Sequence, residues 1–226
     1  MSRVLLLFAY SILLAREESP TLPAAAQAFL PKGWKMLALV SADLNSDGRA
    51  DLVFVREEQD PGKVKRDETI SPAEQNFNPR VLVVLLAEGD GYRKLAEYPR
   101  LIPPAFDLEF SCFEDRFAGI AVKKGVLTVT FRYWASAGSW TMSMEHYKFR
   151  LESGRLRLIG RDKDSFSRAS GEQEAESINY LTGQRKQTTG GNEFTDKPSH
   201  PKDSWDKVDI KKPVYLEDLL PCGQDS

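Results

Sequence analysis

The stretch Asp43-Leu44-Asn45-Ser46-Asp47-Gly48-Arg49-Ala50-Asp51 lies between two short apolar runs, residues 36–40 (MLALV) and residues 52–55 (LVFV). Apolar runs of this length, bounded by turn residues, predict β-strands. The stretch itself carries oxygen-bearing side chains at alternate positions and a glycine where the chain must turn. The sequence therefore predicts a strand, an acidic loop and a second strand, and with them a β-rich fold.

The acidic loop has the layout of a calcium site. Calcium takes roughly six to eight oxygen ligands, and closely spaced carboxylates can supply several of them from one turn. Such a site would be structural, because crowded short polar side chains repel or compete unless a cation organises them. Magnesium fits less well, since it demands a stricter octahedron. The alternative is a solvated Asp/Asn/Gly turn that holds no metal.

An EF-hand is excluded on two counts. Its calcium loop joins two helices and ends on a bidentate Glu at position twelve. Here the loop joins two predicted strands, and Phe54 occupies that position.

Length and composition describe an ordinary folded protein. The chain has 226 residues, enough for one domain or two small ones, with 41% hydrophobic and 28% charged residues. The formal net charge is −2, and the basic residues are scattered. Neither feature favours binding to nucleic acid.

The N-terminus resembles a secretory signal. Arg3 precedes an uninterrupted, mostly apolar run at residues 4–14, and Arg16 and two glutamates end that run. The run is too short to span a bilayer, so the mature chain is expected to have no stable membrane span. We predict a signal peptide at residues 1–15 and a periplasmic or secreted protein. The alternative is a buried N-terminal strand or helix.

Two cysteines are compatible with export. Cys112 and Cys222 could form one disulfide that ties the C-terminal tail to the core, or they could be two buried thiols. Their spacing excludes a Cys-x-x-Cys redox or zinc site.

The second half of the chain predicts further hairpins. Residues 126–134 follow the turn Lys123-Lys124-Gly125, and they place Val129, Phe131 and Tyr133 on one face with polar residues between them. This period of two is typical of a half-buried strand. The turn Glu152-Ser153-Gly154 joins the next two predicted strands, residues 140–151 and 155–160.

These patterns predict a mostly β fold, an antiparallel meander of hairpins resembling one or two propeller-like blades, with short helices near the termini. The expected organisation is a signal peptide (1–15), a short helix and lead-in (16–34), a β domain (35–183) that includes the calcium-loop unit (35–98), and a polar, partly flexible C-terminal segment (184–226).

Residues 42–55, followed by the apolar residues 81–86 and the turn Gly89-Asp90-Gly91-Tyr92, resemble one FG-GAP or VCBS-type repeat over residues 35–98. The resemblance implies a four-stranded unit and a calcium ion. The implied ligands are the side chains of Asp43, Asn45, Asp47 and Asp51 and the carbonyl oxygen of Arg49. There is no second acidic loop, so a complete propeller is not expected. Such repeats occur mostly in exported proteins.

The sequence contains no catalytic motif. It has no G-x-S-x-G elbow, P-loop or G-x-G-x-x-G fingerprint, and its two histidines, His146 and His200, offer no zinc cluster. Three acidic residues, Glu109, Glu114 and Asp115, can be imagined as an acid/base set, but solvated loop carboxylates are the more common case.

Aromatic residues gather on two predicted neighbouring strands: Tyr133, Trp134, Trp140, Tyr147 and Phe149. They form either cross-strand packing around a core or a platform for sugars or peptides. The favoured hypothesis is an exported, non-catalytic, calcium-stabilised β-protein that acts as a binding or structural module for a protein or carbohydrate ligand. The alternative is an exported hydrolase or enzyme accessory protein whose site is not visible in the sequence. A pocket with convergent polar groups would favour the enzyme, and an exposed groove or patch would favour the binding module.

Overall fold

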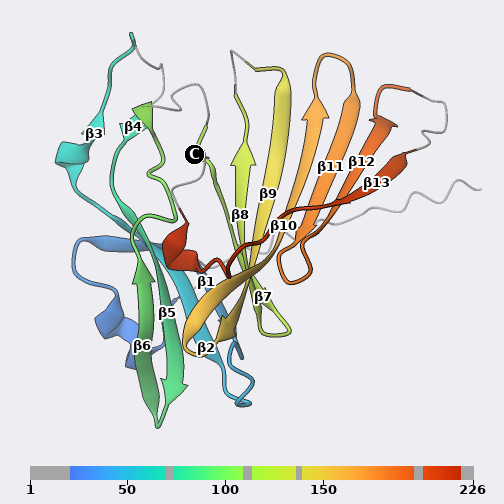
Figure 1. The fold of residues 1–226 in the computed structure, drawn as a ribbon. Coiled ribbons are helices and arrows are strands. Elements are labelled where there is room, and N and C mark those ends of the chain that lie inside the picture. The colour runs from blue at the N-terminus through green and yellow to red at the C-terminus, as the bar shows by residue number, and fades with distance from the viewer. Residues whose placement is uncertain (1–20, 70–73, 109–113, 136–138, 196–200, 220–226) are drawn as a thin grey trace, which may run out of the picture.

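The first half of the chain forms a four-stranded antiparallel sheet in the computed structural model, which describes residues 21–69, 74–108, 114–135, 139–195 and 201–219 (Figure 1). Its strands, in spatial order, are β1 (Trp34–Ala42), β2 (Asp51–Glu58), β5 (Arg80–Glu88) and β6 (Gly91–Tyr98). The acidic loop joins β1 to β2, as the sequence predicts. The connection from β2 to β5 contains η2 (Pro61–Lys63) and the short pair β3 (Val64–Lys65) and β4 (Gln75–Asn76).

The second half forms a seven-stranded antiparallel sheet in which every strand pairs with its neighbour in the sequence. Its strands are β7 (Phe117–Lys123), β8 (Val126–Tyr133), β9 (Thr141–Glu152), β10 (Arg155–Ser167), β11 (Glu172–Asn179), β12 (Gln184–Asn192) and β13 (Lys202–Lys207). The predicted mostly β fold of antiparallel hairpins is therefore confirmed.

The first sheet is buried on both faces, which explains why its central strands read as continuous apolar runs. One face of β2 and β5 contributes Val53 and Val84 to a core shared with the second sheet. The opposite face contributes Phe54 and Val83 to a smaller cluster. The segment around η1 (Ala24–Phe29) covers this smaller cluster, with Ala26 fully buried.

The second sheet supplies one face to the shared core. Leu127, Val129 and Phe131 of β8 alternate with less buried residues and are fully buried, as the period of two predicts. On β9, Phe149 is fully buried in the same core, and Tyr147 packs edge-to-face on Phe131 with ring centroids 5.9 Å apart. Tyr133 also packs against this core, so three of the five singled-out aromatics serve packing.

An ion-pair network connects the two sheets. The Arg80 side chain of β5 donates to both carboxylate oxygens of Asp115, each at 2.7 Å, just before β7. Its Nε donates to Glu57 of β2, also at 2.7 Å, and Glu57 pairs in addition with Lys35 at 2.9 Å. Burial opposes ionisation of Glu57, but the hydrogen bonds from Lys35 and Arg80 outweigh it and hold the pKa of this carboxyl below its ordinary value.

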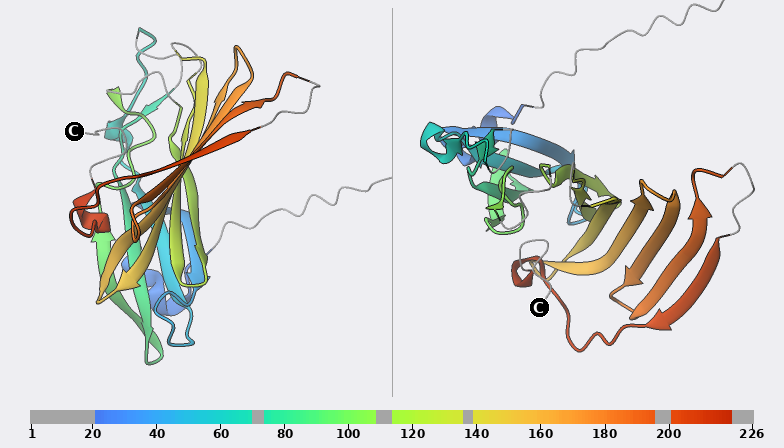
Figure 2. Two further views of the ribbon diagram at one scale, coloured as in Figure 1. Left: turned by 45° about the vertical axis from the view of Figure 1, so that its right-hand side comes forward. Right: turned by 90° about the horizontal axis from the view of Figure 1, so that it is seen from above.

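The second sheet continues well beyond the first. Strands β10 to β13 fan outward from the region where the two sheets meet (Figure 2). The outermost strands, β12 and β13, are formed by residues 184–192 and 202–207. They belong to the polar C-terminal segment, whose composition indicates loose packing. The pairing is stabilised by cross-strand charges in place of apolar burial: Arg185 of β12 pairs with Asp206 of β13 and lies 3.6 Å from Glu176 of β11.

The chain then returns to the core. The short helix η4 (Leu216–Asp218) lies near the C-terminus, where a short helix is expected, and its Leu216 side chain is buried in the shared core. Cys112, Cys222 and the predicted signal peptide lie outside the described residues. In the part of the chain that the structure describes, no helix has both the length and the apolarity needed to cross a membrane.

Candidate functional site: an acidic loop and an apolar groove

The acidic loop is closed by hydrogen bonds from its own backbone. The Asp43 carboxylate accepts from the amide of Ser46 at 2.6 Å and from that of Gly48 at 2.9 Å. Asn45 Oδ1 accepts from the amide of Asp47 at 3.0 Å, and Asp47 Oδ1 accepts from that of Arg49 at 2.8 Å. Side chains that bond the backbone two residues ahead favour turns over regular structure, so these residues fold locally as a loop.

Backbone conformation explains the glycine in this loop. Gly48 has a φ of 84°, in the left-handed region that glycine adopts without steric cost. Asp47 is exposed. Its pKa is held below the ordinary value mainly by a hydrogen bond from the Asn45 side chain and, to a lesser extent, by one from the Arg49 amide. The loop therefore presents an ionised carboxylate to solvent at neutral pH.

Asp51, the last candidate ligand, points into the protein. It is fully buried at the start of β2. One of its carboxylate oxygens accepts from the amide of Leu44 at 2.9 Å, and the other accepts from the amide of Ala87 in β5 at 2.8 Å. Asp51 thus fastens the loop to the neighbouring strand. Arg49 makes a second tie, since its side chain donates to the carbonyl of Gly89 in the β5–β6 turn.

The donor set of the loop consists of oxygen atoms only, which suits a hard cation. The structure brings Asp43, Asn45 and Asp47 together on the exposed side of the loop, and it places Asp51 on the inner side. Each carboxylate oxygen has two lone pairs, so an oxygen that accepts one amide can still bind a cation. Among the described residues, no group of three or more His, Cys, Asp or Glu side chains is arranged so that it could hold a metal ion as it stands.

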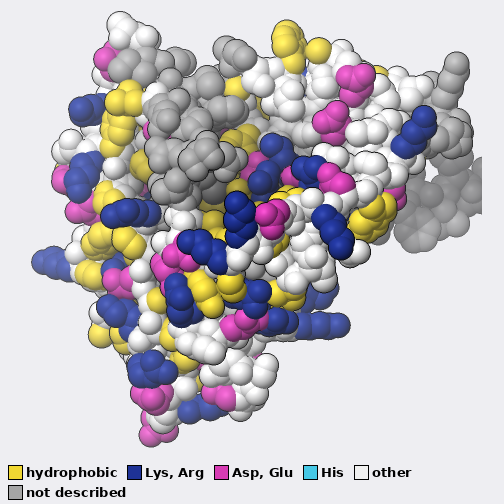
Figure 3. Space-filling view, in the orientation of Figure 1, with side chains coloured by type: hydrophobic (Ala, Val, Ile, Leu, Met, Phe, Trp, Pro, Cys, Tyr) yellow, Lys and Arg dark blue, Asp and Glu magenta, His cyan; other side chains and the backbone are white. Residues whose placement is uncertain are grey.

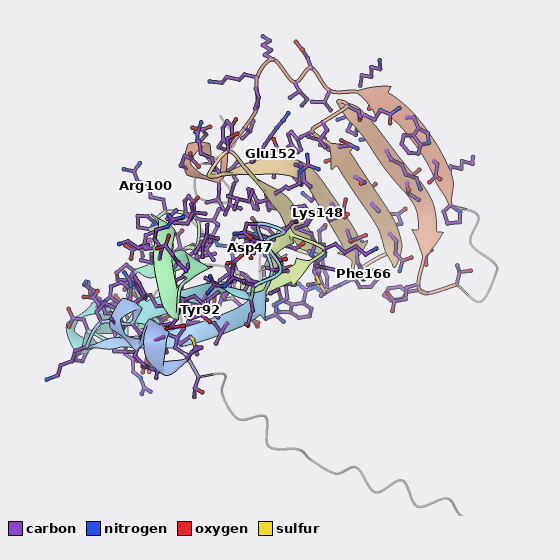
Figure 4. All side chains as sticks on the ribbon, turned by 90° about the horizontal axis from the view of Figure 1, so that it is seen from below. Asp47, Tyr92, Arg100, Lys148, Glu152 and Phe166 are labelled. Carbon is purple, nitrogen blue, oxygen red and sulfur yellow. The ribbon has the colours of Figure 1, made fainter. Side chains whose placement is uncertain are left out.

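The β7–β8 turn lies against this loop. A Cβ added at Gly125 would lie 3.6 Å from the carbonyl oxygen of Leu44. The loop therefore occupies the end of the first sheet that approaches the second, where Figure 4 labels Asp47. A change of loop conformation would therefore affect both sheets.

A second candidate site is an apolar groove of about 450 Å³ on the extended sheet. Two rows of directly paired residues contribute to it. One row runs across β8 to β12, and the next runs across β9 to β12. The first row is Arg132, Met144, Asp164, Ala175 and Thr188, and the second is Met142, Phe166, Gln173 and Gly191. Paired residues in a sheet share a face, so the rows place the apolar side chains of Met142, Met144 and Phe166 side by side.

Exposed aromatic residues accompany the groove. Phe194 is 61% exposed and packs edge-to-face on Phe166, with ring centroids 5.8 Å apart. Trp140, which precedes β9, is 69% exposed. Arg168 lies between Trp140 and Trp134, with its guanidinium carbon 4.6 Å from the Trp134 ring centroid. Large exposed apolar side chains next to a groove are typical of interaction surfaces.

Sequence reasoning included Trp134 and Trp140 in a possible platform but did not identify Met142, Met144 and Phe166. The sequence pattern that could have identified them is the alternation of these residues on two strands joined by a tight turn. In the paired hairpin, Met142 lies opposite Phe166 and Met144 lies opposite Asp164. Recognising it requires the register of the hairpin, which a bulge near Ile159 shifts by one residue.

The two described residues of the imagined acid/base set, Glu114 and Asp115, each form an ion pair with an arginine. Asp115 is the partner of Arg80, and Glu114 pairs with Arg132 at 3.4 Å on the surface. Glu109 and His200 lie outside the described residues. His146 Nδ1 lies 3.0 Å from the Thr130 hydroxyl on the neighbouring strand, consistent with a structural histidine.

The electrostatics of the surface are mixed. Figure 3 shows basic and acidic side chains interspersed on the face that it presents. Among the described carboxyls whose pKa is shifted, the shift is downward in each case, as for Asp47, Glu57 and Asp162. For Asp162, burial opposes ionisation, but hydrogen bonds from Lys148 and Ser177 outweigh it. These carboxyls are ionised at neutral pH and are unsuited to act as general acids.

No protein-family model, curated protein or solved structure matches this chain.

Proposed function

We propose that this protein is an exported, non-catalytic β-protein, stabilised by calcium, that binds an apolar segment of a partner protein in the groove on its extended sheet. The observation that carries the proposal is the groove itself, where Met142, Met144 and Phe166 form an apolar surface next to exposed aromatic side chains. Methionine side chains are flexible and polarizable, and they adapt to apolar partners of varied shape.

The size and lining of the groove support binding over catalysis. A volume of about 450 Å³ accommodates a few side chains of an extended segment. The polar groups at its margin include Arg132 and Asp164, of opposite charge, which could orient a backbone or a charged flank. The side chains of Met142, Met144 and Phe166 give the groove an apolar centre without hydrogen-bonding groups, so an apolar protein segment is the better fit.

The calcium loop would serve stability in this proposal. Asp43, Asn45 and Asp47 would supply side-chain oxygens, Arg49 its carbonyl oxygen, and Asp51 the lone pairs left by its two amide hydrogen bonds. A cation there would neutralise the crowded carboxylates at the end of the first sheet. The bound ion would supply charge and fixed geometry, while these residues position the loop between β1 and β2.

The test is selection of short displayed peptides on the purified protein, followed by titration of the selected peptides. We expect enrichment of apolar sequences whose binding changes the fluorescence of Trp140. Met144→Asp should weaken binding by about tenfold or more, since a charge would be placed in the apolar lining. Thr128→Asp, on the same face but outside the groove, is the matched control. Selected peptides that bind both variants equally well would refute the groove as the binding site.

A further inference from the structure

A second cavity lies at the opposite end of the long strands from the groove. After β13 the chain returns toward β10, and residues 208–214 of this return are called the strap. The strap is tied at both ends: the Val208 amide donates to Gly183 at 2.8 Å, and the Val214 carbonyl accepts from the Leu158 amide at 2.9 Å. Tyr215, just beyond, forms a β-bridge with Arg157. The strap and the β11–β12 turn border a pocket beside β10, whose lining includes Arg157, Gly183 and Val208.

This space, the strap pocket, has a volume of about 510 Å³. Its lining includes four basic residues and one acidic residue: Arg157, Lys207, Lys211, Lys212 and Asp209. The lining charges therefore sum to +3. Arg157 also forms an ion pair, at 3.1 Å, with Glu152, which lies outside the lining. This pair neutralises part of the Arg157 charge, so the net charge available to a ligand lies between +2 and +3. For a protein whose formal net charge is −2, this is a local excess of positive charge.

The three lysines of the lining differ from Arg157 in their ion pairing. Within the part of the chain that the structure describes, the three lysines have no carboxylate within ion-pair distance, whereas Lys148, Lys163 and Lys186 of the same sheet each have one. All three strap-pocket lysines are exposed. Three like charges at one cavity repel one another unless counter-ions or a ligand neutralise them.

Arg157 adds a guanidinium group to the lining. Its Nε is buried and has no hydrogen-bond partner among the described residues, although Nη1 is paired with Glu152. The same is true of Nε in Arg56, Arg161 and Arg168, so the contribution of Arg157 to the pocket is its charge and the accessible part of its guanidinium group. A phosphate or sulfate group offers several acceptor oxygens to arginine and lysine together.

We infer that the strap pocket binds a small multivalent oxyanion, one that carries two or more phosphate or sulfate groups. The charge of the lining matches two to three negative charges, and the volume admits a molecule of that kind. The site is independent of the apolar groove, because Arg157 and Phe166 lie at opposite ends of β10; Figure 4 labels Phe166 at the far end of the β9–β10 hairpin from Glu152.

The test is calorimetric titration of the full chain at fixed ionic strength with pyrophosphate and, separately, with a disulfated monosaccharide. We expect at least one probe to bind, and the better probe assigns the site to phosphate or sulfate chemistry. Lys211→Gln/Lys212→Gln should weaken binding by about tenfold or more. The control Lys32→Gln/Arg66→Gln removes the same charge from exposed positions on the first half of the chain and should leave binding unchanged.

Arg157→Lys supplies a second variant that keeps the charge but removes the planar set of guanidinium donors. We expect weaker binding with an unchanged cooperative unfolding transition. The inference is overturned if neither probe binds, or if both double variants bind as tightly as the unmodified protein. It is also overturned if the two double variants lose affinity equally, because that result indicates a non-specific charge effect.

Discussion

Replacing Arg80 with leucine should destabilise the protein far more than replacing a surface arginine. Arg80 is 4% exposed and its partner Glu57 is 1% exposed. The substitution leaves the Glu57 carboxylate buried with only one remaining cation, Lys35, and it breaks both bonds to Asp115. Breaking a buried ion pair by removing one partner costs about 3–5 kcal/mol. Since Lys35 remains, we expect a loss near the lower limit, about 3 kcal/mol.

The control is Arg93→Leu, which breaks the exposed pair between Arg93 and Glu88 at 3.2 Å. An exposed pair contributes about 1 kcal/mol or less. At roughly 2–4 °C per kcal/mol for a chain of this size, the melting temperature should fall by about 6–12 °C in Arg80→Leu and by less than about 4 °C in the control. Urea unfolding at neutral pH measures the free energies directly. Equal small losses in both variants would refute the role assigned to the Arg80 network.

Further predictions concern the metal, acid stability, the strap and export. Calcium at a hundredfold excess over its Kd should add about 2.7 kcal/mol of stability, and Asp47→Ala, but not Asp90→Ala, should abolish this calcium-dependent gain; identical melting curves in calcium and chelator would contradict it. The folded-state pKa of Glu57 lies below its ordinary value of 4.5. The ionised Glu57 carboxylate therefore contributes to the free energy of unfolding above pH 4.5, and this contribution is lost as the pH falls through the folded-state pKa. Urea midpoints should therefore drop more steeply below about pH 4.5 in the unmodified protein than in Glu57→Gln, and parallel curves would count against this assignment. Gly183→Ala should destabilise the protein more than Gly33→Ala, as judged by thermal melting: both residues have positive φ, but only at Gly183 would a Cβ lie 2.7 Å from a carbonyl oxygen, that of Val208. N-terminal sequencing of protein from the native host should show a mature chain that starts after Leu14, and an intact Met1 would rule out the predicted cleavage.

The fold class could be predicted from the sequence because strand periodicity and turn residues are local signals. Val129 and Phe131 alternate with polar neighbours, and Gly125 and Gly154 mark the hairpin turns with φ values of 71° and 79°. The strands β12 and β13 were not predictable in this way. Their polar residues pair with neighbouring strands through charge, as in the contact of Arg185 with Asp206, and such pairs become visible only once the register is known.

The candidate sites show the same division. The acidic loop is contiguous in the sequence, so its oxygen-bearing residues could be named in advance, but the inward orientation of Asp51 depends on the distant Ala87 amide. The groove and the strap pocket join residues from several strands. Met144 and Phe166, or Arg157 and Lys211, are brought together by pairing and by the return of the chain, which no local pattern records.

Site-specific photo-crosslinking in the native host tests the central claim most directly. A benzophenone amino acid would replace Phe166 in the groove or, as control, the exposed Lys94 on β6. The account predicts a discrete crosslinked partner from the groove position, lost when Met144→Asp is added, and none from the control position. Absence of a crosslink at Phe166, or the same crosslinked species from both positions, would contradict the assignment of the groove as the partner-binding site.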